Sequence, residues 1–373
     1  MRRMLRNIGA CIALQAATAT TPLPVIGQTT IQVRTAICNG CRIVLDSVGQ
    51  LGSLDGPDAF TEDAVMARLR PREFLVANRT GGAIGLFAVP NTFKYQIGKT
   101  GNGPGEQRIV RRIRVGRGDT IYVLDSLEGR VNIFNSSGRF ISMIRVPRGV
   151  FDFWAVGARR VIVAGAVRSR GSAGYPLHIV EQDGRLTSFG GDGSLLGPGR
   201  ERQLLRLFSR KGNDEIWAAH QKSYTIEGWK GTTRTAILKR DVSWFPEWDG
   251  IESPASARRP TAQIRGINED DAGLLWVFTT VADQNWRPIP LRDAPTPGEK
   301  VSSREDYDRL YDTIIEVIDP RHGSMIVHAR SNRKLTPIGD GYVYSYEVGT
   351  DGAPVYRLWR ARLIRSTQGA GSS

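Results

Sequence analysis

The chain has 373 residues, of which 40% are hydrophobic, 24% charged and 8% aromatic, a composition that excludes a disordered or collagen-like protein. No run of about 18 apolar residues is present, so we expect no membrane-spanning helix. Lys and Arg number 51 against 37 Asp and Glu, a net charge of +14, carried by single arginines scattered along the chain. This scatter is typical of a solvated surface, and a polyanion-binding surface is the alternative.

The first 28 residues have the pattern of a secretory signal peptide. Three arginines among the first six residues precede a short apolar segment with small residues near its end. Cleavage after Ala19 or around Gly27 fits this pattern, and we favour the second position. Cys11 follows a segment that resembles a lipidation signal, but too few apolar residues precede it. We therefore predict an exported protein, either periplasmic or extracellular.

Cys38 and Cys41 frame a Cys-Asn-Gly-Cys segment. Asn-Gly between two apolar stretches predicts a hairpin with a two-residue type I′ turn, which would bring the two thiols together. In an oxidising compartment this pair is expected to form a structural disulfide. A thioredoxin-like redox motif would need a βαβ setting, which the surrounding sequence lacks.

Internal similarity with a constant spacing predicts the fold. The apolar segments 74–78 and 121–125 begin 47 residues apart, and Gly-Pro connectors at 56–57 and 103–104 keep the same spacing. Six apolar strand cores each follow a turn or a polar residue, at 74–78, 121–125, 161–163, 216–218, 274–277 and 342–344. We interpret each as the second strand of a four-stranded unit. Such units, repeated every 40 to 50 residues or so, are typical of β-propeller blades.

The two ends of the chain support a closed ring. The last unit offers only three strands, near 334–338, 342–347 and 355–361, while residues 41–48 form a strand without a unit of its own. Pairing these would remove an open sheet edge. We therefore predict an all-β, six-bladed β-propeller over residues 29–365, with the last blade closed by the N-terminal strand and a disordered tail at 366–373. We expect a monomer.

One unit also resembles a known repeat. Residues 97–106, with their Gly-Pro-Gly connector, and then 118–126, 130–134 and 137–140 resemble an NHL repeat. Over roughly residues 38–362, the chain resembles exported bacterial six-bladed propellers with NHL-type repeats, including their early CxxC strand and the segment 312–320. This resemblance implies the fold and export, but no particular reaction.

In a propeller, the connections between blades and those between second and third strands emerge on one face, here called the loop-rich face. Basic residues of these connections would gather around the channel mouth and attract an anionic ligand, unless they are simply solvated loops. The residues that we predict to bind a ligand there are Arg79, Arg168, Arg170, Arg200 and Arg202.

A long insertion interrupts the fifth unit at residues 281–311. Its first half is rich in proline, and a capping-box pattern from Ser302 to Glu305 predicts a short helix through Leu310. Insertions of this length are commonly functional, and this one would lie over the loop-rich face. Trp286 and Tyr307 are its candidate ligand contacts, although both could instead pack the insertion against the blade.

Catalysis has little support in the sequence. No nucleophile or metal motif is present, and His178 and His328 lie within apolar strands, where packing is the expected role. Propeller lactonases hold calcium with acids and amides at inner-strand starts, where this chain offers only Glu62, Asp63, Asp152, Asn268, Glu269 and Asp270. We therefore predict a non-enzymatic binding protein, without a resident cofactor or metal, whose partner on the loop-rich face is an unknown protein or an anionic ligand. A calcium-dependent lactonase-like or esterase-like hydrolase and a polyanion-binding surface protein are the alternatives. Export argues against nucleic acid as the partner.

Overall fold

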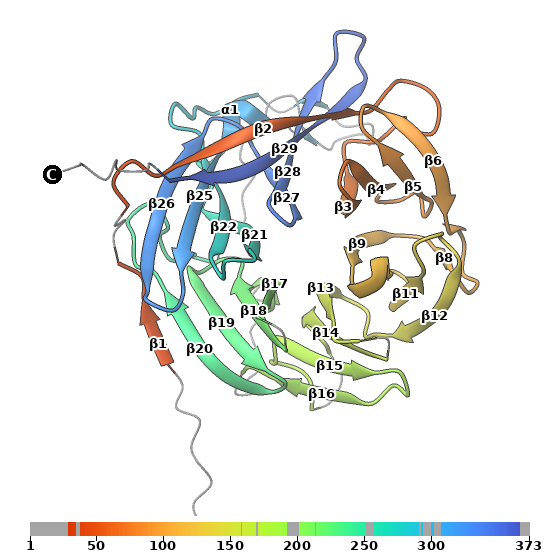
Figure 1. Cartoon of the computed structure of the whole chain (residues 1–373), viewed down its shortest axis with the longest axis horizontal. Helices are drawn as coiled ribbons and strands as arrows, with labels where there is room; N and C mark the ends of the chain where they lie inside the picture. The colour runs from red at the N-terminus through yellow and green to blue at the C-terminus, as the bar shows by residue number, and fades with distance from the viewer. Residues whose placement is uncertain are drawn as a thin grey trace, which may run out of the picture.

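The computed structural model describes residues 29–34, 38–157, 159–168, 171–191, 201–212, 214–250, 257–290, 292–293, 300–301 and 307–365. Six sheets of four or five strands are arranged around a common axis (Figure 1). The predicted six-bladed β-propeller is therefore confirmed. Within the described ranges, no helix combines the length and the hydropathy that crossing a membrane requires.

Each blade has its first strand nearest the axis, as Figure 1 shows. Blades 1 to 3 consist of β3 (Ala64–Arg70), β4 (Glu73–Asn78), β5 (Ile84–Ala88), β6 (Thr92–Ile97); β9 (Val110–Val115), β10 (Ile121–Asp125), β11 (Arg130–Phe134), β12 (Phe140–Arg145); and β13 (Val150–Ala155), β14 (Arg160–Gly165), β15 (Leu177–Glu181), β16 (Leu186–Phe189).

Blades 4 to 6 follow in the same order. They consist of β17 (Arg206–Lys211), β18 (Glu215–His220), β19 (Thr225–Lys230), β20 (Thr233–Lys239); β21 (Gln263–Glu269), β22 (Leu275–Ala282), β25 (Tyr311–Asp319), β26 (Ser324–Ser331); and β27 (Thr336–Gly339), β28 (Tyr342–Val348), β29 (Pro354–Ile364), β2 (Arg42–Leu51). The six strand cores predicted as second strands are β4, β10, β14, β18, β22 and β28, so this assignment is confirmed in every blade.

The hydrophobic core lies between neighbouring blades, because alternate side chains of a strand point to opposite faces of its sheet. In β4, Leu75 and Ala77 pack against blade 2, while Phe74 and Val76 pack against blade 6. All four side chains are at most 1% exposed. This explains why the second strands are nearly continuous apolar runs in the sequence.

The N-terminal strand closes the ring as predicted. β2 pairs antiparallel with β29 along its length, with Val44 opposite Arg362 and Leu51 opposite Tyr356, and Figure 1 shows these two strands side by side. Asp46 and Arg362 form an ion pair across the two strands.

The segment before the closing strand has a role that the sequence did not indicate. β1 (Thr29–Gln32) adds a fifth strand to blade 4, parallel to β20. Next along the chain, Val33 is 6% exposed among side chains of blades 4 and 5, and the Arg34 N–H donates to the Gly323 carbonyl of blade 5. The N-terminal segment therefore contacts blades 4, 5 and 6 in turn.

The predicted disulfide is present, since Cys38 and Cys41 are bonded with a Cα–Cα distance of 5.5 Å. The predicted type I′ turn between them is wrong. Gly40 has a φ of +81°, but Asn39 is not among the residues with positive φ, whereas a type I′ turn needs positive φ at both positions. A left-handed residue only at the second position is the pattern of a type II turn.

The insertion connects β22 to β25 on the loop-rich face. It contains a short hairpin, β23 (Arg292–Asp293) and β24 (Lys300–Val301), followed by α1 (Tyr307–Leu310). The predicted helix is therefore present at its C-terminal end, while residues 302–306 lie outside the described part. The Asp283 N–H donates to the Leu310 carbonyl, which holds the two ends of the insertion together.

The junction between the last and first blades depends on one tyrosine. The Tyr356 hydroxyl donates to the Thr61 carbonyl at 2.5 Å and accepts from the Ala64 N–H at 3.2 Å. Tyr356 is fully buried, so its removal leaves a buried N–H unpaired.

Tyr356→Phe is expected to lower the free energy of unfolding by about 1–3 kcal/mol, the cost of an unsatisfied buried donor. Urea unfolding followed by circular dichroism measures this loss. Tyr342→Phe in the same blade is the matched control, because no hydrogen bond of the Tyr342 hydroxyl is found in the described part of the chain. Equal stability of the two variants would contradict a specific role for the Tyr356 hydroxyl.

Candidate functional site

The candidate site is the central channel, which the first strands of all six blades enclose. A cavity of about 150 Å³ within it, here called the channel pocket, is lined by β3, β9, β13, β17, β21 and β27. The lining residues come mostly from the middle and the end of these strands, from Arg112 to Gly116 in blade 2 for example. The channel pocket therefore extends away from the loop-rich face, toward the turns that join first and second strands.

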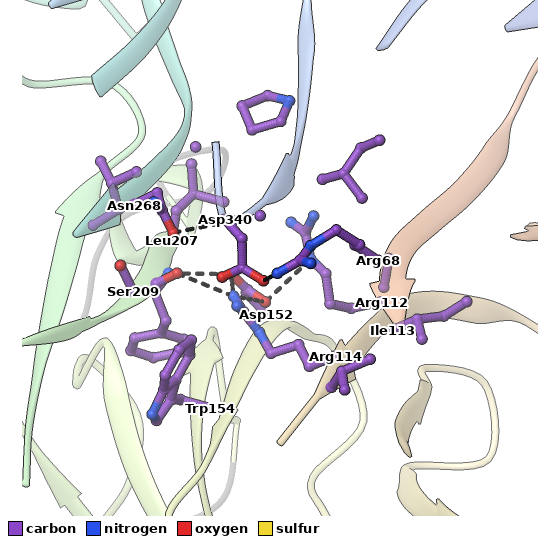
Figure 2. A pocket seen from close by; sticks show the side chains of 18 of the residues that line it. Arg68, Arg112, Ile113, Arg114, Asp152, Trp154, Leu207, Ser209, Asn268 and Asp340 are labelled. Carbon is purple, nitrogen blue, oxygen red and sulfur yellow. Dashed lines mark hydrogen bonds and ion pairs between the residues drawn. The ribbon is translucent and has the colours of Figure 1, made fainter. Parts of the chain in front are cut away.

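A buried carboxylate is the centre of the pocket wall. Asp152 is 1% exposed. Arg114 donates to both of its oxygens at 2.9 and 2.8 Å, and Arg112 donates to one of them at 3.1 Å. The backbone N–H groups of Phe153 and Phe208 also donate to it. Figure 2 shows Asp152 between these two arginines.

These donors decide the ionisation of Asp152. Burial alone would raise the pKa of its carboxyl group, but Arg112 and Arg114 outweigh that effect and hold the pKa below its ordinary value. Asp152 is therefore an anion that compensates the two buried arginines and joins β13 to β9 and β17. This role is structural, since no oxygen of Asp152 lacks a donor.

Extra residues in the first strands change which side chains reach the channel. The pairing of β9 with β10 skips Arg111, that of β13 with β14 skips Phe151, and that of β21 with β22 skips Arg265. A β-bulge of this kind redirects the side chain of the extra residue. The guanidinium of Arg111 consequently lies over the Phe151 ring, 4.4 Å from its centroid.

Four arginines lie close together near the loop-rich end of the channel, and we call them the arginine cluster: Arg79, Arg111, Arg112 and Arg202. The Arg79 carbonyl accepts from the Val110 N–H at 2.9 Å, which holds Arg79 beside the start of β9. Burial, and then the charges of Arg79 and Arg112, lower the pKa of Arg111 to about 10, with a smaller effect from Arg202. Burial also lowers the pKa of Arg79, and Arg112 adds to this effect.

Arg79 and Arg111 make no ion pair with a carboxylate in the described part of the chain, although the nearby charge of Asp152 partly offsets the lowering of the Arg111 pKa. Both are partly buried, and within the described ranges neither guanidinium makes a hydrogen bond or an ion pair. Arg206 at the start of β17 is different, because it lies beside the buried Glu227, with 3.7 Å between Arg206 Nε and Glu227 Oε2. Two partly buried positive charges thus interact unfavourably near the loop-rich end of the channel.

The structure does not bring all of the arginines predicted to bind a ligand together in one cluster. Arg79 belongs to the arginine cluster, and so does Arg202. Arg202 is exposed and lies in η2 (Glu201–Leu204), the short 3-10 helix that precedes β17 of blade 4. Arg168 is exposed and pairs with Glu201 at 3.3 Å. Arg170 and Arg200 lie outside the described residues.

The two aromatic candidates lie in the insertion. Trp286 is partly buried, and its backbone N–H donates to the backbone carbonyl of Asp283 in the turn after β22. Tyr307 is the first residue of α1, and its side chain is outside the described part.

Arg111, Arg112 and Arg114 are site residues that the sequence analysis missed. They occupy three positions of the six-residue strand β9, which belongs to the innermost layer of the ring. The sequence offered a signal for these residues, because three arginines within one predicted inner strand are unusual and arginines are rarely buried unless they are paired. The bulge at Arg111 was not readable from the sequence, since it depends on the pairing with β10.

The acids considered as calcium ligands are engaged elsewhere. Asp152 binds two arginines. Glu269 accepts from the Trp217 indole at 2.6 Å, and Asp270 accepts from the Trp276 indole at 2.9 Å. Glu62 and Asp63 are exposed beside β3. Across the ranges that the structure describes, no group of three or more His, Cys, Asp or Glu side chains is placed to hold a metal ion.

Comparison with known proteins supports the fold. No family model matches the sequence, and no curated protein matches it. Among solved structures, a Bacteroides fragilis protein thought to be exported superposes with a TM-score of 0.55 at 11% identity, over 91% of this chain and 100% of that chain. A DUF4221 family member from Bacteroides vulgatus gives a TM-score of 0.54 at 9% identity, over 86% and 99%.

Virginiamycin B lyase from Staphylococcus aureus is more distant, with a TM-score of 0.43 at 9% identity, over 85% of this chain and 99% of the lyase. At such low identities, the first two similarities show a shared fold and nothing about activity. The similarity to the lyase is too weak to support any inference about this chain. The chain is a six-bladed β-propeller similar to these proteins, and its function has to be inferred from its own residues.

His220, at the end of β18, makes a testable contribution to stability. His220 Nε2 lies 3.5 Å from Glu227 Oε2. Burial, and then the charge of Arg206, lower the pKa of His220 to about 4. The folded protein thus keeps this imidazole neutral where the unfolded chain, with a pKa near 6.5, already binds a proton.

Stability is therefore expected to fall as the pH falls from about 6.5 to about 4, by at most about 1.4 kcal/mol per pH unit from this group. Urea unfolding at several pH values measures the slope. His220→Gln removes the titrating group and should flatten the slope in that window. A slope that is identical in wild type and His220→Gln would refute the assignment.

Proposed function

We propose that this chain is an exported, non-enzymatic binding protein that holds an anionic ligand at the arginine cluster on its loop-rich face. The observation that carries the proposal is the pair of partly buried guanidinium groups, Arg79 and Arg111, which make no ion pair or hydrogen bond in the described part of the chain. Like charges held together and partly withdrawn from water raise the free energy of the folded protein. An anion between them removes this repulsion.

The geometry favours a ligand with a compact oxyanion. Each guanidinium offers up to five N–H donors in a planar fork that matches a carboxylate or a phosphoryl group. The Phe151 ring supports one face of Arg111, so its N–H edge remains available for binding. Export is supported by the signal-peptide pattern of residues 1–28 and by the disulfide between Cys38 and Cys41, which is typical of an oxidising compartment.

The two alternatives differ in their support. A calcium-dependent hydrolase is disfavoured because Asp152, Glu269 and Asp270 are each engaged by arginine or indole donors. Purified protein that hydrolyses lactones or aryl esters only when calcium is added would support that alternative. A polyanion-binding surface would use arginines far from the channel as well, and its affinity for heparin would fall steeply with salt.

Inorganic pyrophosphate is the probe for the arginine cluster, with affinity measured by isothermal titration calorimetry at low and moderate salt. Replacing both unpaired arginines, in Arg79→Gln/Arg111→Gln, is expected to weaken binding by at least about tenfold, because charge-assisted hydrogen bonds are lost. The same variant should be no less stable than the wild type, since two unpaired charges are removed.

Arg168→Gln is the matched control, because Arg168 lies on the same face but is exposed and paired with Glu201. It should bind pyrophosphate like the wild type. No measurable binding to the wild type, or equal binding to the double variant, would overturn the proposal. Heparin binding that survives in the double variant would favour the polyanion-binding surface instead.

A further inference from the structure

A groove outside the channel lies between blades 5 and 6, at the base of the insertion, and we call it the insertion groove. It is lined by the first half of β2, the first residues of the insertion, Asp312 of β25, and the end of β26 with the residues that follow it. Its volume is about 630 Å³, within the range of sites that hold small organic ligands. It shares no residue with the channel pocket or the arginine cluster, so a ligand bound here is separate from the anion proposed above.

Two aspartates at the ends of neighbouring strands meet in this groove. Asp283 directly follows β22, and Asp312 lies opposite Val281 near the end of that strand. Burial raises the pKa of Asp312, Arg330 opposes this effect, and contact with Asp283 raises the pKa further. Two carboxylates in contact repel each other unless a proton or a cation lies between them.

Asp312 keeps one acceptor without a donor. Its side chain belongs to a residue that is 2% exposed, and Arg330 donates to Oδ2 at 2.6 Å. The other oxygen, Oδ1, is buried and accepts no hydrogen bond from the residues that the structure describes. Buried polar atoms without a partner are rare and commonly indicate a missing water or ligand.

Asp283 keeps its charge. It is partly buried, and it forms no ion pair within the described ranges. Its Oδ1 accepts from the backbone N–H of Asn285 at 2.6 Å, and its own backbone N–H donates to the Leu310 carbonyl. The carboxylate is therefore held in a fixed turn at the edge of the groove, before any ligand arrives.

The two arginines that line the groove are engaged elsewhere. Arg330 donates to Asp312 and, through Nη2, to the Ala282 carbonyl at 2.6 Å. The guanidinium of Arg333 lies 4.9 Å from the centroid of the Trp359 ring. Burial raises the pKa of Asp308 in α1, and the charge of Arg333 is one of the effects that oppose this rise, so Arg333 acts on α1.

A primary ammonium group suits this arrangement better than a metal ion does. It carries three N–H donors on a single positive charge, which matches one carboxylate without an ion pair and one buried oxygen without a donor. Calcium takes about six to eight oxygen ligands, whereas the groove offers two carboxylates, one of which already binds Arg330.

The wall formed by β2 is apolar. Ile43, Val44 and Leu45 are consecutive residues of this strand that line the groove, and Ile43 and Leu45 also pack against side chains of blade 5. An alkyl chain lying along this wall would lose contact with water, which favours binding.

We infer that the insertion groove binds a primary alkylammonium ion, with its charged head between Asp283 and Asp312 and its alkyl chain against Ile43 and Leu45. The head donates to the buried oxygen of Asp312 and neutralises Asp283. The insertion then contributes to recognition through its first residue.

n-Pentylamine, a cation at neutral pH, is the probe. 1-Pentanol is its neutral counterpart of nearly the same shape, and tetramethylammonium carries the same charge without an N–H donor. Titration calorimetry on the wild-type protein is expected to show n-pentylamine binding at least about tenfold more tightly than either, because only n-pentylamine makes charge-assisted hydrogen bonds. This comparison needs no variant, so it holds even where a substitution impairs folding.

A conservative variant locates the site. Asp283→Asn keeps an oxygen for the Asn285 N–H but removes the charge, and it is expected to weaken n-pentylamine binding by about tenfold. Asp351→Asn is the matched control, because Asp351 Oδ1 likewise accepts a backbone N–H two residues along the chain, from Ala353 at 3.0 Å, but lies in an exposed turn. It should bind n-pentylamine like the wild type. Thermal unfolding checks that both variants are folded.

Five results contradict the inference: no binding of n-pentylamine by the wild type, equal affinity for n-pentylamine and either counterpart, unchanged binding in a folded Asp283→Asn, equal weakening in Asp351→Asn, and calcium that displaces n-pentylamine at lower concentration than n-pentylamine itself requires. Asp283→Asn should leave pyrophosphate binding unchanged. A failure at the arginine cluster would appear only in the pyrophosphate titration, so the two proposals fail separately.

Discussion

The pairing of β2 with β29 is the interaction on which the rest of the structure depends. It supplies the fourth strand of the last blade from the opposite end of the chain, and Tyr356 on the same strand links that blade to the first one. With the ring closed, six first strands face one axis at a fixed distance from it. The channel, its buried ion pairs and its unpaired arginines exist only because these strands are held there.

Closure also concentrates charge. A propeller axis is lined by one strand from each blade, so a single basic strand such as β9 contributes Arg111, Arg112 and Arg114 to a space shared with five other strands. Asp152 forms ion pairs with Arg112 and Arg114, while Arg79 and Arg111 form none in the described part of the chain. The difference between these two pairs separates structural arginines from those that we assign to ligand binding.

Much of the architecture could be predicted because blades repeat. The second strand of each blade was located by the constant spacing of the first two apolar cores and by the turn or polar residue that precedes each of the others, and the missing fourth strand of the last unit identified the closing strand. β1 could not be predicted, since Thr29–Gln32 is short and polar and pairs only with the edge of blade 4. The turn at Asn39 was assigned the wrong type because Asn-Gly dipeptides occur in more than one turn. The NHL-type character of the repeat stays a prediction.

The site was harder to predict for a physical reason. Arg79 and Arg202 could be predicted to lie on the loop-rich face because the connections on each face of a propeller follow from strand order, and their binding of a ligand stays a prediction. Arg111 and Arg265 reach the channel through bulges, which depend on the register between two strands and leave no mark in a single sequence.

The closing strand has one more consequence, which concerns the order of assembly. β2 is synthesised among the first elements, yet its partner β29 is the last strand of the chain. The ring cannot close until the chain has been made as far as β29, so β2 must wait unpaired, and folding is expected to be slow.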